Sequence, residues 1–271
     1  MADMRIIAHV AINVFKESVR DKVLYNLVAF AVILMGAAYL IGQLTAGQDV
    51  KIIKDLGLAA IGTFGLLIAV FIGIGLVWKE VERRSIYSLL SKPLGRREFI
   101  LGKYAGLALT LLVNVVVMTA ALYLVLGYMD AQFTEEQKAV WAAPAVDAGM
   151  LRAVALIVVE LLLVTAIALF FSTFSSPFLS AALTFGLWVI GHFNADLRNF
   201  ENVVESPAAA GLARALYYVL PNFAAFDIKS QVVYALPIAP GYLAVTAAYG
   251  VAYIALLLTG SVLVFTRRDF K

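Results

Sequence analysis

The sequence contains no cysteine and only two histidines, His9 and His192. Without cysteine the chain has no disulfide bond, thiolate metal site or cysteine nucleophile, and two histidines are too few for a histidine metal centre. No stretch fits the phosphate-binding pattern G-x-x-x-x-G-K-S/T, because the one Gly-Lys pair, Gly102-Lys103, lacks the upstream glycine and the following Ser or Thr. We therefore expect neither a metal site nor a nucleotide cofactor in this chain.

Charged residues are also scarce, at 14% of the chain, whereas 63% of its residues are hydrophobic. A soluble domain is about 45–50% apolar and cannot bury this much more. The net charge of +3 does not predict nucleic-acid binding, because the Lys and Arg residues collect at the ends of apolar segments, as membrane topology requires. Charged residues precede the first long apolar run, so we expect no cleavable signal peptide.

The apolar runs predict an all-α integral membrane protein, built as a single domain over residues 1–271. A membrane-spanning helix needs about 20 apolar residues. An amphipathic interfacial helix is predicted at 4–22, followed by six spans at 23–42, 56–78, 99–128, 150–171, 177–193 and 242–265.

A dense charged island, residues 76–106, separates the second and third spans. Within it Ile86, Leu89 and Leu90 have helical spacing, which predicts a short amphipathic helix that breaks at Pro93. This helix lies outside the bilayer, so its apolar side needs a partner. Its carboxylates do not favour an anionic lipid surface, so we prefer a partner protein to simple contact with membrane lipid. The charged residues are Lys79, Glu80, Glu82, Arg83, Arg84, Lys92, Arg96, Arg97, Glu98 and Lys103.

The island and its flanking spans resemble the membrane subunits of ABC-2 type transporters. The similar residues are E-V-E-R-R-S at 80–85 and L-L-S-K-P-L-G-R-R-E-F-I-L-G-K-Y at 89–104. In that family a cytoplasmic coupling helix joins spans two and three. This chain has Ser85-Ile86 where the family often has a glycine-threonine pair. The run F-K-E-S-V-R-D-K at 15–22 is similar to the connecting helix with which these subunits begin.

The resemblance implies a transmembrane subunit of an ABC exporter that is not itself an enzyme. A second transmembrane subunit, identical or homologous, would complete the pathway, and two cytoplasmic ATPase subunits would bind ATP and magnesium. Residues expected to dock the ATPase are Glu17, Arg20, Glu80, Glu82, Arg83, Arg84, Ile86, Tyr87, Leu89 and Leu90.

Lys and Arg gather in the N-terminal stretch, the island and the C-terminal tail. The positive-inside rule therefore predicts that both termini are cytoplasmic, and the resemblance implies the bacterial inner membrane.

The connection between the fifth and sixth spans, residues 194–241, is predicted to hold short external or re-entrant helices. Ser206 and Pro207 are a favourable N-cap and first helical residue. The run 218–227 resembles a form seen in the bacterial branch of the family associated with multicopper-enzyme maturation.

Glu160 lies in the middle of the fourth span. A carboxylate there costs about 2.5–3.5 kcal/mol on insertion scales, so its side chain should face the protein interior or a wet cavity. Glu160 and Asn114, which lies inside the third span, are therefore candidates for a translocation path. Alternatively, Glu160 fixes helix packing by hydrogen bonding, with Asn114 as its proposed partner.

Two other functions stay open at this stage. An intramembrane enzyme would use Glu160 and His192, and a membrane anchor would dock a partner without moving a substrate. The paired-glutamate pattern of intramembrane proteases is absent, because Glu80 and Glu82 are not adjacent.

Overall fold

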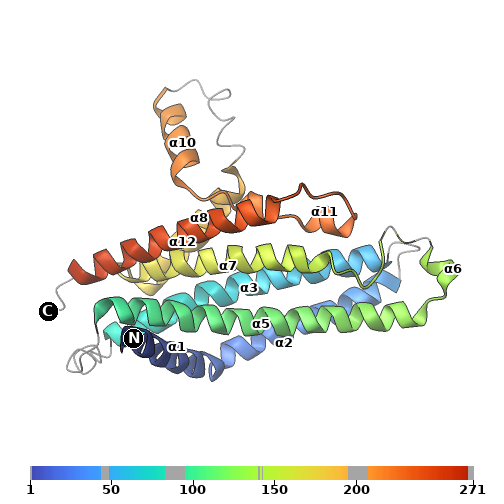
Figure 1. Cartoon of the computed structure of the whole chain (residues 1–271), viewed down its shortest axis with the longest axis horizontal. Helices are drawn as coiled ribbons and strands as arrows, with labels where there is room; N and C mark the ends of the chain where they lie inside the picture. Colours follow the sequence, from blue (N-terminus) through green and yellow to red (C-terminus); the bar gives the residue numbers. More distant parts are fainter. Residues whose placement is uncertain are drawn as a thin grey trace.

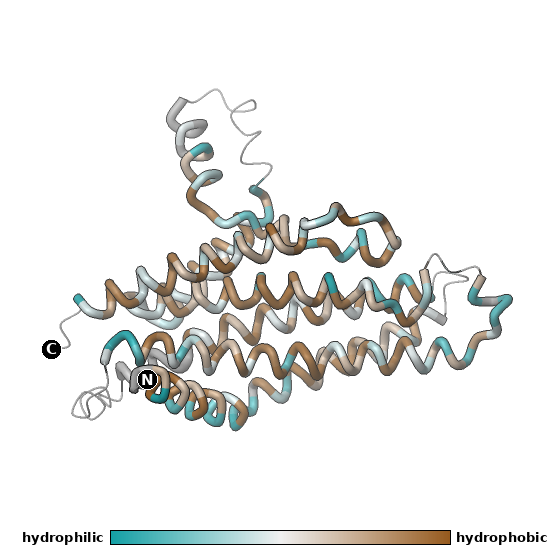
Figure 2. Tube along the Cα trace, in the orientation of Figure 1, coloured by the Kyte–Doolittle hydropathy of each residue, from teal (hydrophilic) through white to brown (hydrophobic). Residues whose placement is uncertain are grey.

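A computed structural model describes residues 2–43, 49–82, 95–139, 141, 143–194 and 207–267. These parts of the chain are helical and contain no strand. Five long helices run along the long axis of the molecule (Figure 1) and are apolar and long enough to cross a membrane. They are α2 (Lys22–Gln43), α3 (Asp49–Glu82), α5 (Arg96–Gln132), α7 (Met150–Ser172) and α12 (Tyr242–Arg267). Apolar residues predominate along their length, and hydrophilic residues gather toward the ends (Figure 2).

Helix α7 forms the centre of the bundle and packs against α3, α5, α8 and α12. Most of its residues are buried, whereas most residues of α2 and α12 are not. Large apolar side chains such as Phe30 on α2 and Leu256 on α12 are exposed. Exposed apolar surface of this kind suits contact with lipid tails.

Helix α8 (Pro177–His192) is the shortest apolar helix of the described bundle, with 16 residues. Ser176 caps its N-terminus by accepting a hydrogen bond from Leu179 N, and Pro177 occupies the first turn. At 1.5 Å per residue such a helix is shorter than the roughly 30 Å hydrocarbon core. The described residues therefore form an all-α architecture with five long candidate spans. The predicted span at 177–193 corresponds to α8, so the predicted total of six spans depends on this short helix.

Helix α3 begins at Asp49, seven residues before the predicted span at 56. The sequence analysis left residues 43–55 outside the predicted spans, and Lys51, Lys54 and Asp55 make this segment polar. Lys54 is nevertheless fully buried and donates a hydrogen bond to the carbonyl oxygen of Pro144 at 2.6 Å. A tertiary partner for the ammonium group allows this polar turn to stay helical.

Helix α1 (Ala2–Val19) packs along the start of α5. At Gly106 an added Cβ would lie 2.6 Å from the carbonyl oxygen of Ala11 and 2.6 Å from Val14 Cβ. The helices approach this closely only because residue 106 has no side chain. The apolar face predicted for 4–22 thus contacts another helix of the same chain, and the helix ends at Val19, with Lys22 starting α2.

The start of α1, the end of α3, the start of α5 and the end of α12 lie toward one end of the bundle (Figure 1). Arg96 ties two of them together, since its Nη1 donates to the carbonyl oxygens of Phe265 at 3.3 Å and Thr266 at 2.6 Å. The rings of Phe99 and Phe265 stack beside this contact, with their centroids 5.6 Å apart. The first turn of α5 is therefore attached to the last turn of α12.

The connection between α8 and α12 contains three short helices among its described residues. They are α10 (Pro207–Val219), the 3₁₀ helix η2 (Phe223–Phe226) and α11 (Lys229–Val233). Helix α10 begins at Pro207, the first helical position expected from the sequence, and projects sideways from the bundle (Figure 1). A further four-residue helix, α6 (Glu135–Lys138), lies between α5 and α7.

Candidate functional site: a polar cluster inside the bundle

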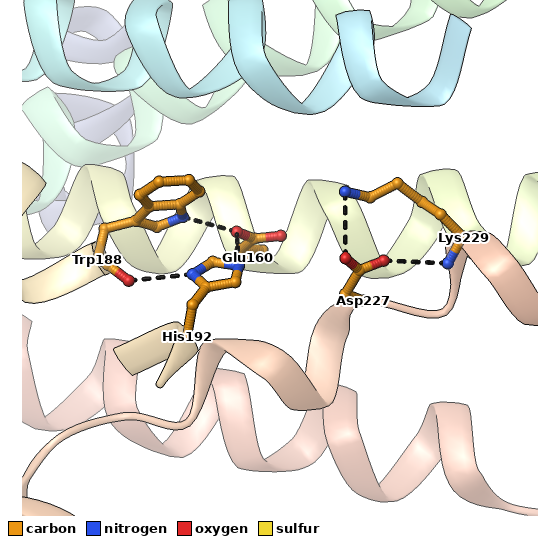
Figure 3. Close-up of polar contacts among 5 residues, drawn as sticks. All are labelled: Glu160, Trp188, His192, Asp227 and Lys229. Atoms are coloured by element: carbon orange, nitrogen blue, oxygen red, sulfur yellow. Dashed lines mark hydrogen bonds and ion pairs between the residues drawn. The ribbon is translucent and has the colours of Figure 1, made fainter. Parts of the chain in front are cut away.

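Glu160 is buried at the middle of α7, as its position in the sequence predicts. Its neighbours come from α8. Trp188 Nε1 donates a hydrogen bond to Glu160 Oε1 at 2.8 Å, and His192 Nε2 lies 3.7 Å from the same oxygen. Figure 3 shows these side chains converging between α7 and α8. The cluster therefore links the most buried helix of the bundle to the shortest apolar one.

The two α8 residues also fix each other. Trp188 and His192 are four residues apart, so they share one face of the helix. His192 Nδ1 lies 3.0 Å from the carbonyl oxygen of Trp188. The ring of Phe223 stacks on the imidazole, with the two ring centroids 5.8 Å apart. This arrangement holds the imidazole with Nε2 toward the carboxylate.

A second ion pair lies in the segment between η2 and α11. Lys229 Nζ is 3.4 Å from Asp227 Oδ2, and the backbone N–H of Lys229 donates to Asp227 Oδ1 at 3.1 Å. Both groups lie close enough to Glu160 to interact with it electrostatically (Figure 3). Two carboxylates and one ammonium therefore lie in the same part of the bundle.

The cluster is suited to holding helices together and not to binding a metal ion. Within the described residues no group of three or more His, Asp and Glu side chains could hold a metal ion. The Trp188 N–H compensates Glu160 for the loss of water in the bundle interior, where an unpaired carboxylate is costly.

Asn114, the expected partner of Glu160, lies elsewhere. It is buried on α5, and its Nδ2 donates to the carbonyl oxygen of Thr110 on the same helix at 2.6 Å. The hydrogen bond that Glu160 accepts comes from Trp188. The sequence analysis missed Trp188, Asp227 and Lys229, although the four-residue spacing of Trp188 and His192 could have indicated a common face toward Glu160.

The predicted ATPase-docking residues fall into three groups. Glu17 and Arg20, at and just beyond the last turn of α1, are exposed. Glu80 and Glu82 lie in the last turn of α3. The remaining residues, together with the predicted coupling helix, lie outside the described residues: Arg83, Arg84, Ile86, Tyr87, Leu89 and Leu90.

Comparison with known proteins places this architecture in a family. Residues 8–270 match the sequence profile described as an ABC-2 family transporter protein. No curated protein matches the chain. The profile covers nearly the whole chain, and together with the long apolar helices it indicates a multi-pass membrane protein of the permease type. The chain belongs to the ABC-2 family of transporter proteins.

Proposed function

We propose that the chain is the transmembrane subunit of an ABC exporter in the bacterial inner membrane, with both termini in the cytoplasm. Two such subunits, identical or homologous, form the substrate pathway. Two separate ATPase subunits bind ATP and magnesium and supply the energy. No residue of this chain is assigned a catalytic role.

The observation that best supports this proposal is the connected end of the bundle where α3 ends and α5 begins. The segment expected to touch the ATPase, residues 83–94, leads directly into Gly95 and Arg96. Arg96 bonds the last turn of α12, and the next turns of α5 hold α1 through Gly106. A force on residues 83–94 therefore acts on α5, α12 and α1 together.

Helix α7 provides the route from this end into the bundle, because α5 and α12 both pack against it. We assign Glu160 a place beside the translocation path, where its bond to Trp188 keeps α8 attached to α7 as the helices move. Asn114, bonded within α5, has a packing role in this proposal.

The enzyme alternative finds less support in the same geometry. Glu160 Oε1 and His192 Nδ1 are both engaged by Trp188, through its indole N–H and its carbonyl oxygen respectively. Both contacts attach these side chains to α8, which is the packing role that this proposal gives them.

The test is affinity purification of the tagged chain from its native membrane, followed by an ATPase assay. We expect an ATPase to co-purify with the native chain and to be lost from the Arg84→Glu variant, because charge reversal would break the docking contact. The matched control is Arg152→Glu on the exposed first turn of α7, at the opposite end of the bundle, which should retain the ATPase.

Purification of the native chain without any ATPase would refute the proposal. Equal retention by the Arg84→Glu variant would refute the docking site only. If the ATPase binds but no substrate stimulates its ATP hydrolysis in reconstituted vesicles, the chain would instead be a membrane anchor.

A further inference from the structure

A pocket of about 420 Å³ lies where α8 ends, between α10, η2 and the first three turns of α12. None of the predictions from the sequence includes it, and it is separate from the Glu160 cluster. Seven of its lining residues carry a hydroxyl or an amide, and the rest are apolar. The polar ones are Asn194, Tyr217, Tyr218, Asn222, Thr246, Tyr249 and Tyr253.

The chemistry of this lining is aromatic and neutral. None of the described residues that line the pocket is charged. An anionic head group would find no cation among them to compensate its lost water, and an ammonium group would find no carboxylate among them. Tyrosine instead offers a flat apolar face together with a hydroxyl that can donate or accept a hydrogen bond.

The pocket walls are fixed by contacts between the segments that form them. The backbone N–H of Asn222 donates to Tyr249 Oη at 2.8 Å, and Asn194 Nδ2 donates to the carbonyl oxygen of Tyr217 at 3.3 Å. An added Cβ at Gly191 would lie 2.6 Å from the carbonyl oxygen of Pro221, so glycine at this position of α8 lets the segment before η2 approach. These contacts connect α8, α10, η2 and α12 at one place.

The tyrosine hydroxyls are the groups that select among neutral ligands. Tyr217, Tyr218 and Tyr253 line the pocket, and each of their hydroxyls can donate and accept a hydrogen bond. A ligand that carries hydroxyls of its own therefore fits this lining better than one that is apolar throughout.

We propose that this pocket binds the uncharged, hydroxyl-bearing head group of an amphipathic molecule, such as the sugar of a glycolipid. A sugar ring stacks its apolar face on tyrosine, and its hydroxyls form hydrogen bonds with the tyrosine hydroxyls. Leu220 and Val245 also line the pocket, and Val245 is 71% exposed on the outer side of α12, where an acyl chain would continue along the helix. A quaternary ammonium would suit the aromatic rings but has no hydrogen to donate to the tyrosine hydroxyls. The site does not depend on the transport proposal.

The test uses the full chain in a sugar-free detergent. Equimolar glucosyl-diacylglycerol, phosphatidylcholine, phosphatidylethanolamine and diacylglycerol with identical acyl chains are added together, and the retained lipids are counted by native mass spectrometry. We expect glucosyl-diacylglycerol to be retained in excess. Tyr217→Phe and Tyr253→Phe should each lower that excess by about tenfold, the effect of one hydrogen bond of typical strength. The control Tyr25→Phe, on the exposed face of α2, should leave it unchanged.

Three outcomes would overturn the proposal. Preferential retention of phosphatidylcholine would identify a cation site, and equal retention of all four lipids would identify contact with acyl chains alone. An excess that survives both substitutions would place the sugar site elsewhere. Because the competition among the lipids is measured on the native chain, it decides the question even if a variant does not fold.

Discussion

Substitution of Gly106 by alanine should detach α1 from α5. The new Cβ would lie 2.6 Å from the carbonyl oxygen of Ala11 and 2.6 Å from Val14 Cβ. Neither atom is the end of a flexible side chain, so α1 itself must retreat by about 1 Å to restore ordinary contacts of 3.5–4.0 Å. Overpacking of this kind costs about 1–3 kcal/mol.

Helix propensity opposes this cost, since alanine in a helix is favoured over glycine by about 0.5–1 kcal/mol. The net loss is therefore about 1–2 kcal/mol, or roughly a tenfold fall in the fraction of molecules with α1 docked. The matched control on the same helix is Gly127→Ala, because nothing lies within 4 Å of an added Cβ there. In this control variant α1 should stay docked, and the only change should be the small gain in stability from the higher helix propensity of alanine.

Disulfide cross-linking measures this docking directly, because the chain has no cysteine of its own. Val14 and Leu107 belong to one small apolar cluster between α1 and α5. The pair Val14→Cys and Leu107→Cys should cross-link quickly in the native and Gly127→Ala backgrounds and about tenfold more slowly with Gly106→Ala. An unchanged rate with Gly106→Ala would refute the inference that the missing side chain sets the approach of the two helices.

Two further predictions concern the contacts of Glu160 and Arg96. Trp188→Phe should destabilise the native chain by about 1–3 kcal/mol, because the buried Glu160 carboxyl loses its hydrogen-bond donor, and by about 1 kcal/mol less in a Glu160→Ala background, where no carboxyl remains. A double-mutant cycle of unfolding in mixed micelles measures the difference, and equal costs in both backgrounds would mean that the bond between Trp188 and Glu160 does not stabilise the bundle. Arg96→Ala removes the donor to the carbonyl oxygens of Phe265 and Thr266, so amide exchange in the last turn of α12 should become faster. The control Arg97→Ala changes an exposed residue and should leave the exchange rate unchanged. Equal exchange rates in the two variants would mean that the Arg96 contact does not hold the two helices together.

Several features of the fold follow from the sequence because their causes are local. A run of some 20 apolar residues can satisfy its backbone in a bilayer only as a helix, so the long helices are already implied by composition. The start of α8 depends on Ser176 and Pro177, which act within one turn, and α10 begins at Pro207, as its sequence predicts. The burial of Glu160 follows from the cost of a carboxylate in lipid.

Other features depend on residues distant in the sequence. The beginning of α3 could not be read from its own residues, because Lys54 stays helical and buried through a carbonyl that lies 90 residues further on, at Pro144. The sequence predicted an apolar face on α1 but not its partner within the chain, because such a face can pack on lipid or on protein. The close approach at Gly106 shows that it contacts α5.

The sequence by itself thus determined that this is a helical membrane protein with a carboxylate inside its fourth span. Only the tertiary structure decided that Trp188 and His192 partner this carboxylate, that Arg96 joins α5 to α12, and that four tyrosines gather at one pocket. The physical reason is the separation along the chain of the residues on which each interaction depends. Hydrophobic burial and helix capping depend on residues within a turn or a span, whereas hydrogen bonds between helices depend on their rotation and height, which the packing of the whole bundle fixes.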